Sequence, residues 1–169
     1  ALSGGTIPDA IGGLTALTYL GLGYNSLSGT IPVSIGGLTA LTYLRLRNNY
    51  QISGTIPWDA IGSLTTLTYL DVWSTALSGT IPDALGSLTS LEMGRNELSG
   101  TIPDAIGGLI ALTELGLENN KLSGTIPAAI GGLTALEILS LSSNELSGTI
   151  PDALGGLTAL RYLRLQWNA

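Results

Sequence analysis

The stretch from Leu112 to Leu122, LTELGLENNKL, decides the fold. It reads L-x-x-L-x-L-x-x-N-x-L, with apolar residues and one asparagine at fixed places and variable residues between them. Near-copies cover residues 17–27, 41–52, 67–77, 88–98 and 136–146, and a last one runs from residue 160 to Asn168. A motif that returns every roughly 20 to 30 residues indicates a solenoid, in which successive coils stack instead of closing into a globule.

An Ile-Pro dipeptide marks the period of the repeat. It begins at residues 7, 31, 56, 81, 102, 126 and 150, so the spacings are 24, 25, 25, 21, 24 and 24 residues. One long repeat has an insertion at Tyr50-Gln51, and the other has Trp58 as an extra residue. The short repeat keeps the whole L-x-x-L-x-L-x-x-N pattern over 88–96, so its deletion lies in the segment before that pattern. We therefore predict a single array of about seven repeats over residues 1–169, with length changes outside the stacked strands.

Each repeat predicts three short elements. Leucines alternate with variable residues over 19–23, which indicates a strand, and parallel stacking of such strands gives one long sheet with the variable side chains outside. The L-S-G-T-I-P segment, as over 122–127, predicts a second short strand that ends at the proline, with serine and threonine facing out. The D-A-I-G-G-L segment predicts a short helical turn, and its first-turn carboxylates are Asp9, Asp83, Asp104 and Asp152. The expected fold is a β-rich α/β solenoid.

The fixed asparagine of each repeat predicts a structural ladder. A buried asparagine can satisfy backbone donors and acceptors of adjacent coils, and stacked repeats would place these side chains in a column. The expected members are Asn25, Asn49, Asn96, Asn120, Asn144 and Asn168. Thr75 replaces the asparagine of the third repeat, and we expect a local weak point there.

Composition excludes several functions. The net charge is -6 with no basic run, so nucleic acids and anionic membrane surfaces are poor partners. The chain has no cysteine and no histidine, and no metal-ligand spacing is present, so we expect no metal and no cofactor. No apolar run is long enough to span a membrane, and no signal peptide is visible in this segment.

The full pattern L-x-x-L-x-L-x-x-N-x-L-S-G-x-I-P-x-x-[IL]-G-x-L resembles the plant-type leucine-rich repeat over essentially the whole chain. The resemblance implies a right-handed arc with a concave parallel sheet, a second Ile-Pro strand in each repeat and short convex helical turns. It also implies extracellular recognition, as in receptor-kinase ectodomains and polygalacturonase-inhibiting proteins, while some relatives bind ice. Cysteine-paired caps are absent. We therefore expect a fragment of a longer array whose apolar ends are covered by flanking repeats or neighbouring subunits.

The variable positions of the concave strands are the first candidate site. The residues at these positions differ between repeats, while the leucines and the asparagine of the motif stay nearly constant. Tyrosine, tryptophan and arginine, which occur among them, are enriched at binding hot spots. The expected partner-binding residues are Tyr19, Tyr24, Tyr43, Arg45, Arg47, Tyr69, Asp71, Trp73, Arg164 and Trp167. These positions predict binding of a protein, peptide or glycan partner. The alternative is that tyrosine simply suits an exposed strand.

The Ser-Gly-Thr columns are the second candidate site. Stacking would place outward threonines in a regular row, namely Thr6, Thr30, Thr55, Thr80, Thr101, Thr125 and Thr149, with a serine two residues before most of them. Such a flat grid of hydroxyls and methyls would suit ice binding, O-glycosylation or side-by-side packing with another solenoid. The alternative is recent duplication of repeats in which threonine suits a strand edge.

Catalysis has little support in the sequence. Asp71 and Glu92 could form a carboxylate pair on adjacent strands, but no pocket is evident and carboxylates near arginines are ordinary surface charge. We therefore predict a non-catalytic, extracellular interaction module that binds through its concave sheet. A structural or ice-binding solenoid is the alternative.

Overall fold

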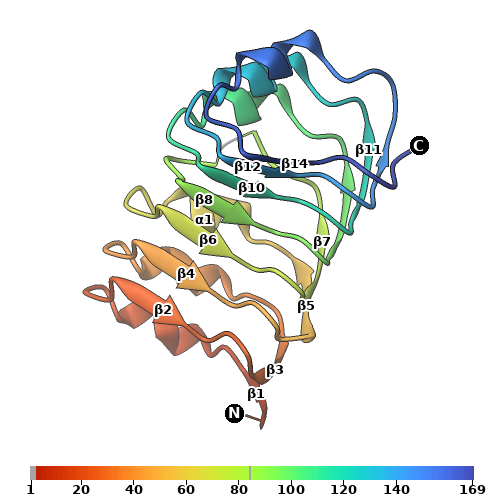
Figure 1. The fold of residues 1–169 in the computed structure, drawn as a ribbon. Helices are drawn as coiled ribbons and strands as arrows, with labels where there is room; N and C mark the ends of the chain where they lie inside the picture. The colour runs from red at the N-terminus through yellow and green to blue at the C-terminus, as the bar shows by residue number, and fades with distance from the viewer. Residues whose placement is uncertain (1–2, 84) are drawn as a thin grey trace.

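The computed structural model describes residues 3–83 and 85–169, which form a solenoid of stacked coils (Figure 1). Two parallel sheets of seven strands run along the stack, one on each of two sides of the coils. The first, here called the concave sheet, contains β2 (Tyr19–Gly21), β4 (Tyr43–Arg45), β6 (Tyr69–Asp71), β8 (Ser90–Glu92), β10 (Glu114–Gly116), β12 (Ile138–Ser140) and β14 (Tyr162–Arg164). The predicted β-rich solenoid is confirmed.

The second sheet, here called the outer sheet, differs from the prediction in two ways. Its strands are β1 (Ser3–Thr6), β3 (Ser26–Gly29), β5 (Gln51–Thr55), β7 (Ala76–Gly79), β9 (Glu97–Gly100), β11 (Lys121–Gly124) and β13 (Glu145–Leu146). Most of them end at or before the Ser-Gly-Thr glycine, so the prediction that they reach the proline was wrong. The glycine takes a left-handed backbone conformation, with φ of 78° at Gly124, which departs from regular strand geometry, and only β1 and β5 extend past theirs, to Thr6 and Thr55.

The second difference concerns how the coils are aligned. In the concave sheet equivalent residues pair directly, as Leu44 does with Leu70. In the outer sheet Gly29 pairs with Ile52, whose own repeat equivalent is Leu27, so equivalent residues are displaced by two positions along the strand. The predicted straight columns therefore exist on the concave sheet, and the corresponding rows on the outer sheet are oblique.

Short helical turns lie opposite the concave sheet (Figure 1). They are η1 (Asp9–Gly13), η2 (Val33–Gly37), α1 (Trp58–Gly62), η3 (Asp104–Gly108), η4 (Ala128–Gly132) and η5 (Asp152–Gly156). The expected first-turn carboxylates are found at Asp9, Asp104 and Asp152. Asp83 lies in the shortened repeat, whose described residues form no helix, so that part of the prediction was wrong.

The extra residue Trp58 lies beside the shortened repeat. Its indole Nε1 donates a hydrogen bond to the carbonyl oxygen of Thr80, at 2.9 Å, and its ring packs against the core. The inserted side chain therefore ties the third coil to the coil that has lost its helical turn.

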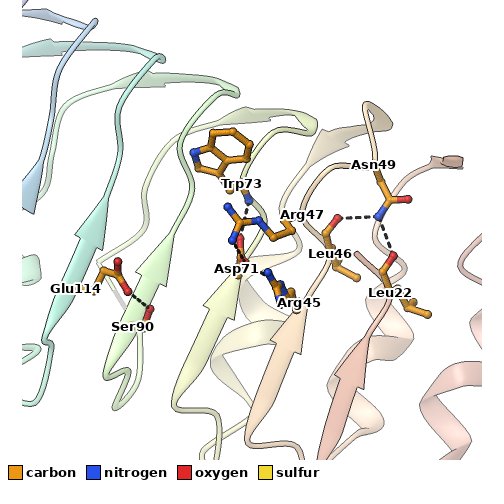
Figure 2. A network of polar contacts seen from close by, with 9 residues as sticks. All are labelled: Leu22, Arg45, Leu46, Arg47, Asn49, Asp71, Trp73, Ser90 and Glu114. Atoms are coloured by element: carbon orange, nitrogen blue, oxygen red, sulfur yellow. Dashed lines mark hydrogen bonds and ion pairs between the residues drawn. The ribbon is translucent and has the colours of Figure 1, made fainter. Parts of the chain in front are cut away.

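The predicted asparagine ladder is confirmed. Asn120 Oδ1 accepts a hydrogen bond from the backbone N–H of Leu98, at 3.0 Å, and its Nδ2 donates to the carbonyl oxygens of Met93 and Leu117, at 3.0 and 3.1 Å. Asn49, Asn96, Asn144 and Asn168 make the same contacts, and Asn25 donates to the carbonyl oxygen of its own coil. The asparagines from Asn49 onward thereby each join two coils (Figure 2, Asn49).

At Thr75 the backbone groups that an asparagine would bind have other hydrogen-bond partners. The backbone N–H of Ile52, which an asparagine at position 75 would bind, donates instead to the carbonyl oxygen of Asn49, at 3.0 Å. The inserted Tyr50-Gln51 segment precedes Ile52, and the Thr75 hydroxyl lies 2.6 Å from Asn96 Oδ1. The insertion and the substitution therefore compensate for each other, and the backbone groups at the expected weak point have partners.

The core is one continuous column of leucine and isoleucine between the two sheets and the helical turns. Leu44, Leu70, Leu91, Leu115 and Leu139, the central residues of successive concave strands, are fully buried. Among the described residues, no helix has both the length and the apolar character needed to cross a membrane.

Candidate functional site

The concave sheet presents its variable side chains in rows, because equivalent residues of neighbouring strands pair directly. The first row consists of Tyr19, Tyr43, Tyr69, Ser90, Glu114, Ile138 and Tyr162. The second consists of Gly21, Arg45, Asp71, Glu92, Gly116, Ser140 and Arg164. The third, two residues further along each coil, consists of Gly23, Arg47, Trp73, Gly94, Glu118, Ser142 and Gln166.

Three tyrosine rings form a stack across the first strands of the sheet. The ring centroids of Tyr19 and Tyr43 are 4.5 Å apart, and those of Tyr43 and Tyr69 are 4.0 Å apart, with interplanar angles of 12° and 6°. Burial raises the pKa of Tyr69, as do a hydrogen bond with Tyr43 and the negative charge of Asp71, so its hydroxyl stays protonated at neutral pH. The predicted tyrosine column is thus present as a rigid, neutral aromatic surface.

Beside this stack lies a buried carboxylate between two arginines. Asp71 has no exposed surface, and its Oδ2 lies 3.3 Å from Arg45 Nε and 3.4 Å from Arg47 Nη1 (Figure 2). Its Oδ1 accepts a hydrogen bond from the backbone N–H of Trp73, at 3.1 Å. Burial raises the pKa of the Asp71 carboxyl, although that N–H and the two arginines act in the opposite direction. Asp71 is therefore the shared counter-ion of both guanidinium groups, through ion pairs that lack hydrogen-bond geometry.

Trp73 lies between two arginines and is fixed by a hydrogen bond. The guanidinium carbons of Arg47 and Arg95 are each 5.1 Å from the centre of its ring, and its Nε1 donates to Glu118 Oε1, at 2.8 Å. Both distances to the ring fall within the range of cation–π contacts. Arg95 and Glu118 were not among the predicted site residues, although their positions in the repeat mark them as concave.

Tyr24 joins this group at the edge of the sheet. The guanidinium carbons of Arg45 and Arg47 lie 5.5 and 5.9 Å from the centre of its ring. Its backbone is left-handed, with φ of 58°, which is uncommon for a bulky residue. We define the aromatic–arginine cluster as Tyr19, Tyr24, Tyr43, Tyr69, Arg45, Arg47, Asp71, Trp73 and Arg95.

Two of the predicted residues lie elsewhere. Arg164 belongs to β14 and Trp167 follows it, at the opposite end of the concave sheet from β2. Both are exposed, and neither contacts the aromatic–arginine cluster. The structure therefore brings together eight of the ten predicted partner-binding residues and separates these two.

A group of carboxylates follows the aromatic–arginine cluster along the sheet. Glu92 on β8, Glu114 on β10 and Glu118 beyond β10 are here called the acidic cluster. Burial raises the pKa of Glu92 to about 8, and repulsion from Glu114, Glu118 and Asp71 acts in the same direction. The sequence shows that this region is acidic, but not that the Glu92 and Glu118 carboxylates extend over the glycines Gly116 and Gly94 of the neighbouring coils.

The predicted threonine row is present, with all seven side chains exposed. A Cβ atom placed on Gly124 would lie 2.9 Å from Cγ2 of Thr101, so the threonine methyl of one coil covers the glycine of the next. The serines do not complete a free hydroxyl grid, because hydroxyls such as that of Ser78 lie 3.3 Å from a carbonyl oxygen of the preceding coil. The threonines and the adjacent prolines line shallow grooves, one of which has a volume of about 580 Å³.

A family model for the leucine-rich repeat matches residues 6–50, 65–122 and 110–169. The chain belongs to the leucine-rich-repeat family. A search of curated protein sequences found no significant match.

Several solved leucine-rich-repeat structures are similar to the chain. The ectodomain of the receptor kinase GASSHO1/SCHENGEN3 from Arabidopsis thaliana, in complex with CASPARIAN STRIP INTEGRITY FACTOR 2, is 36% identical with a TM-score of 0.94 over 98% of this chain. The Arabidopsis receptor kinase HAESA, in complex with the peptide hormone IDA and the co-receptor SERK1, is 40% identical with a TM-score of 0.90 over 99% of this chain. A plant ice-binding protein is 33% identical with a TM-score of 0.85 over 100% of this chain.

This leucine-rich-repeat chain corresponds to only part of each neighbour. It spans 20% of the GASSHO1/SCHENGEN3 chain, 29% of the HAESA chain and 55% of the ice-binding protein. The likeness therefore establishes the repeat type and the architecture.

Proposed function

We propose that this chain is a non-catalytic, extracellular interaction module whose concave sheet binds a peptide segment of a protein partner. The aromatic–arginine cluster is the observation that carries the proposal. It combines three stacked tyrosines with a tryptophan held between two arginines, all on one sheet. Tyrosine, tryptophan and arginine are the residue types that dominate binding energy at interfaces.

Preorganisation is the proposed basis of affinity. Asp71 is the counter-ion of Arg45 and Arg47, and Glu118 fixes the Trp73 indole before any partner arrives. Side chains that are already ordered lose little conformational entropy on binding, so more of the contact energy appears as affinity. The similar HAESA structure, solved as a complex with the peptide hormone IDA and a co-receptor, supports a peptide as the partner.

Replacing Trp73 with alanine should weaken peptide binding by about 2 kcal/mol, or roughly thirtyfold in Kd. The substitution removes the ring that Arg47 and Arg95 cover, so a large contact surface and both cation–π contacts are lost. Peptides selected from a random-peptide library on the purified protein would be measured by calorimetry against Trp73→Ala and Tyr43→Ala. Thr101→Tyr, on the outer side of the coils, is the control and should bind normally. Loss of binding in the control with retention in both concave variants would contradict the proposal.

Ice binding is a second candidate function, favoured by the exposed threonine row together with the likeness to a plant ice-binding protein. Because every threonine methyl of the row except that of Thr149 rests on a glycine of the next coil, these side chains are held in place. If it binds ice, the purified chain will show thermal hysteresis, and Thr101→Tyr with Thr125→Tyr will abolish it. Ice crystals that grow without shaping in the presence of the protein would eliminate this function.

A further inference from the structure

Each glycine in the three rows of the concave sheet lies against the side chain of another residue. The rows contain four glycines, namely Gly21, Gly23, Gly94 and Gly116. A Cβ atom on Gly21 would lie 2.7 Å from Cε1 of Tyr19, and one on Gly23 would lie 3.2 Å from Cγ of Arg47. These glycines therefore provide the room in which longer side chains lie along the sheet.

Gly94 lies against two side chains that are hydrogen-bonded to each other. A Cβ atom at this position would lie 2.8 Å from Cδ1 of Trp73 and 2.5 Å from Oε1 of Glu118. These side chains come from the coils on either side of Gly94, and the indole Nε1 of Trp73 donates to Oε1 of Glu118 at 2.8 Å. Because Cβ atoms do not come within 3.0 Å of other heavy atoms, an alanine here would displace both groups.

The backbone of Gly94 does not itself require glycine. Its conformation is not left-handed, and its carbonyl oxygen accepts the backbone N–H of Ser74, at 2.8 Å, as in a regular coil. The nearest atoms that an alanine would meet belong to side chains, which can rotate away without separating two coils. The need for glycine at position 94 therefore comes from the Trp73–Glu118 pair and not from the stacking of the coils.

We infer that Gly94 is a positioning residue of the peptide-binding surface, because it provides the room in which Glu118 reaches Trp73 and fixes its indole ring. The inference rests on the proposed peptide-binding function and adds a residue that acts on the peptide only through Trp73. An alanine at this position would push the ring and the carboxylate apart and break the hydrogen bond between them. A ring that is free to rotate must be ordered again when the peptide binds, which lowers the affinity.

Gly94→Ala tests this role, with Gly116→Ala as the matched control. Both substitutions add one methyl group to a glycine of the concave sheet that lies against a carboxylate, but the closest contacts of Gly116 are all with Glu92. In NMR spectra of the purified protein, the Trp73 indole N–H signal of Gly94→Ala should move toward its position in Glu118→Ala, which lacks the acceptor. In Gly116→Ala the signal should stay at its position in the unmodified protein.

Calorimetry with library peptides that depend on Trp73 measures the effect on binding. Gly94→Ala should weaken the affinity about tenfold, less than the roughly thirtyfold expected for Trp73→Ala, because the ring is displaced and not removed. Added to Trp73→Ala, the same substitution should cost less than about twofold more, because Gly94 acts only through that ring. Gly94→Ala and Gly116→Ala should share one urea midpoint, so the lost affinity does not come from unfolding.

Three results would overturn the positioning role: an unmoved indole signal in Gly94→Ala, additive losses in the double variant, or normal peptide binding by Gly94→Ala where Trp73→Ala binds weakly. The last of these leaves peptide binding intact. If no library peptide depends on Trp73 or Tyr43, the proposed function fails by itself. An indole signal that moves in Gly94→Ala, and not in Gly116→Ala, would then still support the positioning of Trp73 by Gly94.

Discussion

Replacing Arg45 and Arg47 together with methionine is expected to lower the free energy of unfolding by about 3 kcal/mol at neutral pH. Both arginines contact the same oxygen of Asp71, whose side chain has no exposed surface. Methionine keeps much of the apolar stem but removes the positive charge, so the carboxylate remains buried without a counter-ion and beside Glu92. Urea denaturation followed by circular dichroism measures the change.

The cost of the double substitution should depend on pH. Burial already raises the pKa of the Asp71 carboxyl above its ordinary value of 3.8, and loss of the arginines would raise it further. Because the folded protein then holds this proton more tightly than the unfolded chain does, stability falls as the pH rises through the folded-state pKa. The difference from the unmodified protein should therefore shrink from about pH 7 toward about pH 4.

Two further variants isolate the buried charge as the cause. Arg161→Met removes an exposed arginine that is paired with Glu137, and should change stability by less than about 0.5 kcal/mol. Asp71→Asn, added to the double variant, removes the buried charge and should recover much of the lost stability. If the double variant is as stable as Arg161→Met, then Asp71 reaches water in solution and the aromatic–arginine cluster is not preorganised.

The concave sheet could be predicted from the sequence because its alignment follows directly from the repeat. Leucines alternate with variable residues in every strand, and equivalent strands pair without displacement, so Tyr19, Tyr43 and Tyr69 had to be neighbours. The outer sheet could not be predicted in the same way. Its strands are displaced by two residues between coils and most of them end at or before a left-handed glycine, and neither feature follows from the repeat spacing.

The candidate site was only partly predictable, because side chains cross between strands. The repeat fixes which residues face the concave side, and it identified most of the aromatic–arginine cluster. It does not fix the direction in which a long side chain turns. Glu118 reaches back to Trp73 in a coil two repeats earlier, and Arg95 covers the same ring from the next coil. Such contacts depend on rotamers and on neighbouring glycines, which a repeat alignment does not contain.

Some glycines of the helical turns are required because two coils approach each other there. In η3 and η4 the backbones of successive coils touch, and a Cβ atom on Gly107 would overlap the backbone carbonyl of Ala129. The next residue, Gly108, has no atom within 4 Å of the same construction. Neither glycine has a left-handed backbone, so a side chain would strain neither backbone. The two positions differ only in the room that is available for an added Cβ atom. The close approach of η3 to η4 therefore requires glycine at position 107 alone of this pair.

Gly107→Ala should accordingly destabilise the protein by about 3 kcal/mol, because a backbone carbonyl cannot move aside without separating two coils. Gly108→Ala is the matched control and should stay within about 0.5 kcal/mol of the unmodified protein, since alanine is favoured over glycine in an exposed helical turn. Thermal unfolding of both variants, monitored by circular dichroism, tests the pair. Equal melting temperatures would mean that η3 and η4 are further apart in solution, and that the coils do not stack through backbone contact on this side.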